Sequence, residues 1–153
     1  MTRLEEEIQS KFSSEYHKLT VGILYTHGRL VAAANEVLKP YGLTLQQFNI
    51  LRILRGQMPH AATVSLLKER MLDKMSDASR LVERLRTKGF IERRTSAEDR
   101  RQANISITKK GLETLERIGD FDGILTAVSK VVTEEDARTT NKTLDNLRDA
   151  LGA

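Results

Sequence analysis

The 153-residue sequence contains no cysteine and no tryptophan, only two prolines, and no apolar run long enough to span a bilayer. Without cysteine, the chain has no disulfides, no thiolate metal sites and no thiol-based redox sensing. Its histidines, His17, His27 and His60, are scattered and not paired with carboxylates at metal-ligand spacing, and no glycine-rich phosphate loop is present. We therefore expect no metal, no cofactor and no enzymatic activity.

The first residues carry negative charge, with Glu5, Glu6 and Glu7 in a row. A secretory signal would place positive charge and then an apolar stretch there, so we expect a cytoplasmic protein without a membrane partner. The composition, 39% hydrophobic and 30% charged, is typical of a folded globular chain. The length predicts one domain, with at most an appended helical element.

Positive charge is concentrated in one segment. Residues 68–110 hold 13 Lys or Arg and 7 Asp or Glu, whereas the remainder holds 12 basic and 14 acidic residues. The whole excess behind the net charge of +4 therefore lies in this segment, as is typical of a nucleic-acid-binding module. A solvated basic surface without a partner remains the alternative.

Apolar spacing predicts a series of helices interrupted by one hairpin. A helix over residues 16–38 ends at Pro40 and Gly42, and the next begins at a capping box of Thr44 and Gln47. Shorter helices follow over residues 63–71 and 75–88, the latter closed by Gly89. The spacing of apolar residues then changes to the alternation of strands, which predicts a two-stranded hairpin over residues 90–107. A helix over residues 108–132, with a kink or break expected near Gly119 and Gly123, precedes a last helix over residues 133–151.

The helices over residues 63–71 and 75–88 form a helix-turn-helix candidate. The second helix buries one apolar stripe, and its outer face carries hydroxyl, carboxylate and guanidinium groups of the kind that contact DNA bases and phosphates in a major groove. An ordinary surface helix is the alternative interpretation. The candidate DNA-binding residues of this face are Ser76, Asp77, Ser79, Arg80 and Arg84.

The hairpin tip is rich in arginine, with Arg93, Arg94, Arg100 and Arg101. Such a loop can lie on the phosphate backbone or insert a guanidinium into a narrow minor groove. The spacing of Asp99 and Arg101 permits an ion pair that would fix the loop and aim the arginine. Double-stranded DNA is therefore the expected partner. We call the hairpin the wing, and we expect Arg94, Arg100 and Arg101 to contact DNA from it and Asp99 to position it.

The run LVERLRTKGFIERRTSAEDRRQANISITKKG, from Leu81 to Gly111, resembles the winged-helix signature of MarR-type regulators. The resemblance rests on the Lys-Gly helix end, the Phe-Ile-Glu-Arg strand, the Asp-Arg-Arg wing and the Ile-Thr-x-x-Gly helix start. Upstream, YGLTLQQFNILRIL at Tyr41 to Leu54 is similar to the corresponding helix of that family.

This resemblance implies a mainly α (α+β) fold: a winged helix-turn-helix with a two-stranded β-wing and flanking N- and C-terminal dimerisation helices. The expected regions are residues 1–38 (dimerisation), 39–110 (DNA binding) and 111–153 (dimerisation). It also implies a homodimer that binds a pseudo-palindromic operator, and apolar residues beyond the needs of a small winged domain agree with dimerisation. These residues are Leu4, Ile8, Phe12, Leu144, Leu147 and Leu151.

Family members commonly respond to small anionic or aromatic effectors, so the resemblance implies a ligand-responsive repressor. In this chain the effector crevice would draw on Tyr25, His27, Phe48 and Arg52, although packing is the more ordinary role for such side chains. A winged-helix protein-interaction module, or an antirepressor that does not bind DNA, is the alternative function. The arginine-rich wing favours DNA binding.

Overall fold

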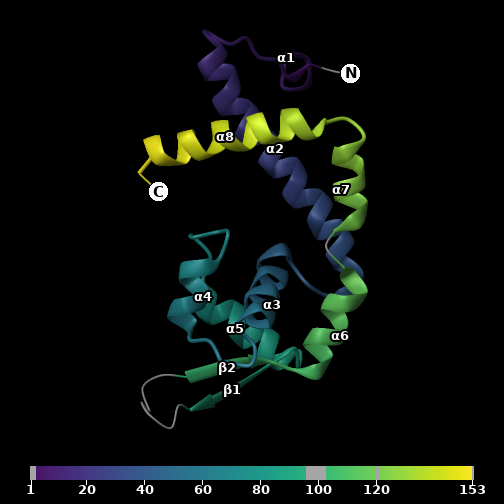
Figure 1. The fold of residues 1–153 in the computed structure, drawn as a ribbon, viewed down its shortest axis with the longest axis vertical. Helices are drawn as coiled ribbons and strands as arrows, with labels where there is room; N and C mark the ends of the chain where they lie inside the picture. The colour runs from purple at the N-terminus through teal and green to yellow at the C-terminus, as the bar shows by residue number, and fades with distance from the viewer. Residues whose placement is uncertain (1–2, 96–102, 120, 153) are drawn as a thin grey trace. The chain divides into compact units, whose positions relative to one another are not determined.

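The computed structural model describes residues 3–95, 103–119 and 121–152 (Figure 1) and divides the chain into two compact units, Met1–Ile118 and Gly119–Ala153. The second unit contains α7 (Asp122–Ser129) and α8 (Glu134–Ala150). The described helices all lack the combination of length and apolar character that crossing a bilayer requires. The elements of the first unit are α1 (Leu4–Glu7), α2 (Glu15–Leu38), the 3-10 helix η1 (Lys39–Tyr41), α3 (Leu45–Gln57), α4 (Val64–Arg70), α5 (Ala78–Thr87), β1 (Ile91–Thr95), β2 (Ala103–Ile107) and α6 (Lys109–Ile118).

The start of α3 follows the predicted capping box. The hydroxyl oxygen of Thr44 accepts a hydrogen bond from the Gln47 backbone N–H at 3.3 Å, and Gln47 Oε1 accepts one from the Thr44 N–H at 3.2 Å. Two of the free N–H groups at the helix start are satisfied in this way. Just before it, Gly42 adopts φ 66°, which favours glycine and turns the chain from α2 into α3.

The turn between α4 and α5 is held by Asp73. Because of this turn, α5 is shorter than the helix predicted over residues 75–88. The carboxylate of Asp73 accepts hydrogen bonds from the Met75 N–H at 3.0 Å and the Ser76 hydroxyl at 2.7 Å. Residues 75–77 therefore stay outside the helix, and α5 begins at Ala78 rather than at Met75. The expected start was wrong because short acidic side chains offer the backbone turn bonds that compete with helix.

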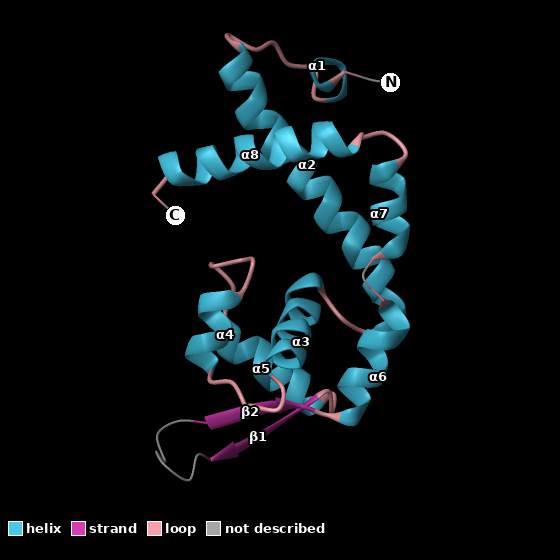
Figure 2. Cartoon of the chain, in the orientation of Figure 1, coloured by secondary structure: helices cyan, strands magenta, loops and turns pink. Residues whose placement is uncertain are grey.

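The hairpin is antiparallel, with Ile91 opposite Ile107 and Thr95 opposite Ala103. It is tied to the helices through Ile105, whose backbone exchanges hydrogen bonds of 2.8 and 2.9 Å with Ala62, just before α4. Figure 2 shows the two strands running along one side of α3, α4 and α5. The wing is therefore fixed at its base to the helix-turn-helix.

Gly119 ends α6 and separates it from α7. Its φ of 67° is left-handed and breaks the helix predicted over residues 108–132, whereas Gly123 lies inside α7. In the second unit, α8 begins after Thr133, whose hydroxyl oxygen accepts a hydrogen bond from the Asp136 N–H at 3.1 Å, as expected for a cap.

The core of the first unit draws on nearly every element after α1. Almost wholly buried apolar side chains come from α2, α3, α4, α5, β2 and α6, so these elements share one core and hold α5 and the hairpin as one framework. Representative members are Leu38, Leu51, Leu67, Leu85, Ile105 and Leu115. Together with the paired strands, this arrangement is the winged helix-turn-helix fold that the sequence predicts.

Candidate nucleic-acid interface

The outward face of α5 presents arginines to solvent. On the inward side, Ala78, Val82 and Leu85 are buried and anchor the helix to the core. Arg80 and Arg84 lie one helical turn apart on exposed positions, and neither guanidinium forms an ion pair with any residue that the structure describes. Ser79 is exposed beside them. This face can therefore donate hydrogen bonds to an anionic surface or to base edges.

Ser76 and Asp77 lie at the start of α5 and both take part in fixing it. Asp77 Oδ1 accepts a hydrogen bond from the Arg80 backbone N–H at 3.0 Å, which caps the helix. Ser76 is half-buried, and its hydroxyl donates to Asp73. The hydroxyl of Ser76 and the backbone N–H of Met75 lower the pKa of the Asp73 carboxyl, because they stabilise its charged form.

Two residues that are not among the predicted site residues also shape this turn. Asp73 organises it, as described above, and Asn49 Oδ1 accepts a hydrogen bond of 2.9 Å from the Leu72 backbone N–H, which links α3 to the turn. The sequence signal for Asp73 was the Asp-x-x-Ser spacing of a side-chain turn. No local pattern could reveal Asn49, because it lies on a different helix.

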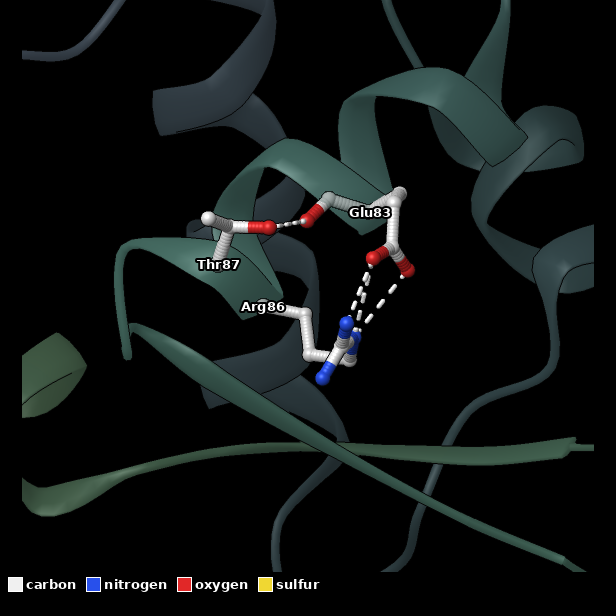
Figure 3. Close-up of polar contacts among 3 residues, drawn as sticks. All are labelled: Glu83, Arg86 and Thr87. Atoms are coloured by element: carbon white, nitrogen blue, oxygen red, sulfur yellow. Dashed lines mark hydrogen bonds and ion pairs between the residues drawn. The ribbon is translucent and has the colours of Figure 1, made fainter.

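Glu83 and Arg86 form a closely paired carboxylate and guanidinium on α5 (Figure 3). Arg86 Nε donates to both Glu83 oxygens, at 3.1 and 3.0 Å, and Arg86 Nη2 donates to Oε1 at 2.6 Å. The hydrogen bonds from Arg86, followed by the positive charges of Arg86 and Arg93, lower the pKa of Glu83. This pair is not among the residues predicted from the sequence, although its spacing along the helix permits it.

The wing contributes a second set of arginines. Arg93 and Arg94 are exposed on β1, and Arg94 forms an ion pair with Glu92 at 3.1 Å. The remaining predicted wing residues, Asp99, Arg100 and Arg101, lie outside the described residues. The expected ion pair between Asp99 and Arg101 therefore stays a prediction.

The four candidate effector residues lie on α2 and α3 in different surroundings. The Tyr25 hydroxyl donates to Glu7 Oε2 at 2.8 Å, a bond that raises the tyrosine pKa, and His27 is exposed. Phe48 is 2% exposed within the core, with the Arg52 guanidinium 5.9 Å from its ring centroid. Two open surface depressions of the first unit, one near Lys18 and one near Gln46, have none of the four in their linings.

No group of three or more histidine, aspartate or glutamate side chains suited to a metal ion occurs in the described part of the chain.

Comparison with known proteins shows which proteins this chain is similar to. Residues 41–102 match the model of the MarR family. The transcriptional repressor MprA of Escherichia coli K12 is 31% identical over 100 residues, which are 65% of this chain and 57% of MprA. The helix-turn-helix and wing region of this chain is thus similar to the MarR family. The match to MprA spans less than two thirds of the length of that protein.

Solved MarR-type structures share the fold well beyond that region. The organohalide-sensing RdhR transcriptional regulator in its 2,4-dichlorophenol-bound form superposes with a TM-score of 0.80 at 21% identity, over 98% of this chain and 89% of that one. A mutant MarR from E. coli complexed with operator DNA gives a TM-score of 0.77 at 23% identity, over 90% of this chain and 99% of that one. The likeness therefore confirms the winged helix-turn-helix as the fold of this chain.

Proposed function

We propose that this chain is a MarR-type regulator: a sequence-specific, double-stranded-DNA-binding transcriptional regulator that acts as a repressor. The observation that carries the proposal is the outward face of α5, where Arg80 and Arg84 are exposed and form no ion pair within residues 3–95, 103–119 and 121–152. A helix of this kind fits a major groove, where arginine donates to the O6 and N7 atoms of guanine. MprA, the relative described above, is itself named a transcriptional repressor.

Each predicted contact residue takes a defined role in this proposal. Arg80 and Arg84 contact base edges, and Ser79 contacts a base or a phosphate. Ser76 and Asp77 fix the start of α5 at the groove and lie close enough to its N-terminus to approach base edges. On the wing, Arg94, Arg100 and Arg101 contact backbone or minor groove, and Asp99 aims Arg101.

The regulator is proposed to act as a homodimer. On α2, Leu19, Leu24 and Leu30 are exposed although they are apolar, and on the second unit Leu125 and Val131 are exposed as well. Several large apolar side chains left exposed on a folded chain are typical of an interface, and a second copy of the chain is the occupant that a two-fold operator requires. Two α5 helices would then contact half-sites about 10 base pairs apart. Residues 1–38 and 111–153 are the proposed dimerisation regions, on either side of the DNA-binding region 39–110.

A small anionic or aromatic effector is proposed to release the repressor from DNA. RdhR was solved with 2,4-dichlorophenol bound, which supports a phenolic class of ligand. Tyr25, His27, Phe48 and Arg52 stay the candidate contacts. The effector must bind the DNA-competent and DNA-incompetent states with different affinities, since otherwise it shifts no equilibrium. In this role the protein acts by binding alone, without catalysis, in the cytoplasm.

Fluorescence anisotropy tests the DNA-binding proposal. The protein is titrated onto duplex DNA from upstream of its own coding region and onto a scrambled duplex, over a series of salt concentrations. We expect preferential, salt-sensitive binding to the upstream duplex that Arg84→Ala and Arg101→Ala weaken. As a matched control, Arg138→Ala removes an exposed arginine from α8 and should bind as the wild type does. Equal binding to both duplexes, unaffected by Arg84→Ala and Arg101→Ala, would instead favour the protein-interaction module.

Sedimentation equilibrium tests the dimer. Leu24, which is 67% exposed on α2, is replaced by glutamate, and Leu72, which is 80% exposed in the α4–α5 turn, receives the same substitution as a control. We expect Leu24→Glu to weaken self-association and Leu72→Glu to leave it unchanged. A wild-type protein that remains monomeric at micromolar concentration would contradict the dimer.

A further inference from the structure

Arg86 is the one arginine of α5 whose guanidinium is held by a carboxylate on the same helix. Its Nε and Nη2 atoms donate to Glu83, and the side chains of Arg86 and Glu83 remain 50% and 52% exposed. A surface ion pair of this kind contributes little to folding stability, because water screens it. Its main structural consequence is therefore orientation of the guanidinium.

The hydrogen bonds to Glu83 occupy only one edge of the guanidinium. Arginine has five N–H donors, and the edge formed by Nε and Nη2 is the one that Glu83 accepts. One N–H group of Nη1 and one N–H group of Nη2 form the end edge, and this edge makes no ion pair with any residue that the structure describes. That edge has the fork geometry that suits two oxygens of a phosphate group.

Arg86 lies at the junction between α5 and the wing. It belongs to the last turn of α5, and in Figure 3 its guanidinium projects from that helix toward the hairpin strands. The positive charge of Arg93, on β1, also helps to lower the pKa of Glu83. Two neighbouring lysines already form hydrogen bonds within the protein. Lys88 Nζ donates to the Gly42 carbonyl, and Lys110 Nζ donates to the Lys88 carbonyl.

The following inference rests on the proposed function. In a DNA complex of that kind, the junction between α5 and the wing would face the sugar–phosphate strand between two grooves. When a helix occupies a major groove and the adjoining wing reaches the neighbouring minor groove, the sugar–phosphate strand that separates the two grooves passes over the region between them. We propose that Arg86, oriented by Glu83, contacts a phosphate of this separating strand through its end edge. Arg86 thus sets the register of the recognition helix without reading sequence, and Glu83 is its positioning residue.

Anisotropy titrations over a salt series test the contact, with Arg86→Gln as the variant. The matched control is Arg138→Gln, which removes the same charge from an exposed arginine that Glu134 pairs on α8. Because α8 lies in a proposed dimerisation region, sedimentation equilibrium first establishes that this variant self-associates as the wild type does. We expect Arg86→Gln to weaken binding several-fold to both the upstream and the scrambled duplex. It should also reduce the slope of log Kobs against log salt by about 0.9, the loss of one phosphate contact. Arg138→Gln should match the wild type in both respects.

A double-mutant cycle tests the positioning role of Glu83. We expect Glu83→Ala to weaken binding in the wild-type background, because Arg86 loses its orientation. In the Arg86→Gln background the same change should strengthen binding, because it removes an unpaired carboxylate near the phosphates. This reversal of sign separates positioning from a simple charge effect, and circular dichroism of each variant confirms its fold.

The outcomes separate this inference from the function on which it rests. A wild-type protein with no salt-dependent binding to either duplex overturns the proposed function and the phosphate contact together. Salt-dependent wild-type binding with identical behaviour of Arg86→Gln and Arg138→Gln overturns the phosphate contact alone. An equal effect of Glu83→Ala in both backgrounds overturns the positioning role.

Discussion

A single methyl group added at Gly111 should destabilise the winged domain measurably. Gly111 is buried in the first turn of α6, where the helix meets the base of the hairpin. A Cβ atom at this position would lie 2.5 Å from the Phe90 carbonyl oxygen and 2.6 Å from Ile107 Cγ1. Because one of these contacts is backbone, a change of rotamer cannot relieve the clash, and α6 must shift relative to β1 and β2.

The magnitude follows from two opposing effects. Overpacking of a tight site costs about 1–3 kcal/mol, whereas alanine in place of glycine inside a helix gains up to about 1 kcal/mol. Gly111→Ala should therefore lower the free energy of unfolding by about 1–2 kcal/mol. For a chain of this size that corresponds to a fall in Tm of about 2–8 °C.

Urea and thermal unfolding followed by circular dichroism measure this effect, with Gly56→Ala as the matched control. Gly56 lies in α3, is exposed, and would place its Cβ in open space, so this variant should be as stable as the wild type or slightly more stable. If Gly111→Ala proved as stable as Gly56→Ala, the close approach of α6 to the hairpin base would be refuted.

Three further substitutions probe the turn, the cap and the N-terminal segment. Asp77→Ala removes the cap of α5 and should lower the free energy of unfolding by about 0.5–2 kcal/mol; no change in urea unfolding would contradict the cap. The pKa of Asp73 is lower in the folded protein than its usual value, so its stabilising contribution is present above that value and is lost as the pH falls through the lowered pKa. Asp73→Asn should thus destabilise the protein at neutral pH, with a difference from the wild type that shrinks below about pH 4; a difference independent of pH would argue against the turn. Tyr25→Phe removes the bond to Glu7 and should speed amide hydrogen exchange in α1 without changing exchange in α3; unchanged exchange in α1 would show that the bond does not hold this segment.

Local signals in the sequence predicted most of the helical framework. The helices predicted to start at Thr44, at residue 63 and at residue 133 are each capped there, by Thr44, Thr63 and Thr133, because a cap is a short-range interaction between neighbouring residues. Gly89, with φ 76°, closes α5 where expected. The switch from helical to alternating spacing after that glycine predicted the hairpin.

The errors and omissions arise where two local signals compete or where partners are distant in sequence. The apolar spacing predicted that α5 begins at Met75. Instead, the Asp73 carboxylate accepts a hydrogen bond from the Met75 N–H and holds residues 75–77 in a turn, so α5 begins at Ala78. The bond from Leu72 to Asn49 joins separate elements, so no sequence window contains both partners. Among the candidate site residues, Arg80 and Arg84 were predictable from helical spacing, whereas the pairing of Arg86 with Glu83 required coordinates, since other partners lay within reach.

A hydroxyl-radical footprint on the upstream duplex tests the central claim most directly, because it reports where each strand is covered. Two copies of α5 with their wings should protect two half-sites about 10 base pairs apart, related by two-fold symmetry, with further protection in the flanking minor grooves. Protection should disappear as salt is raised. A footprint without two-fold symmetry, or none under conditions where the protein is folded, would contradict the account of this chain as a dimeric DNA-binding regulator.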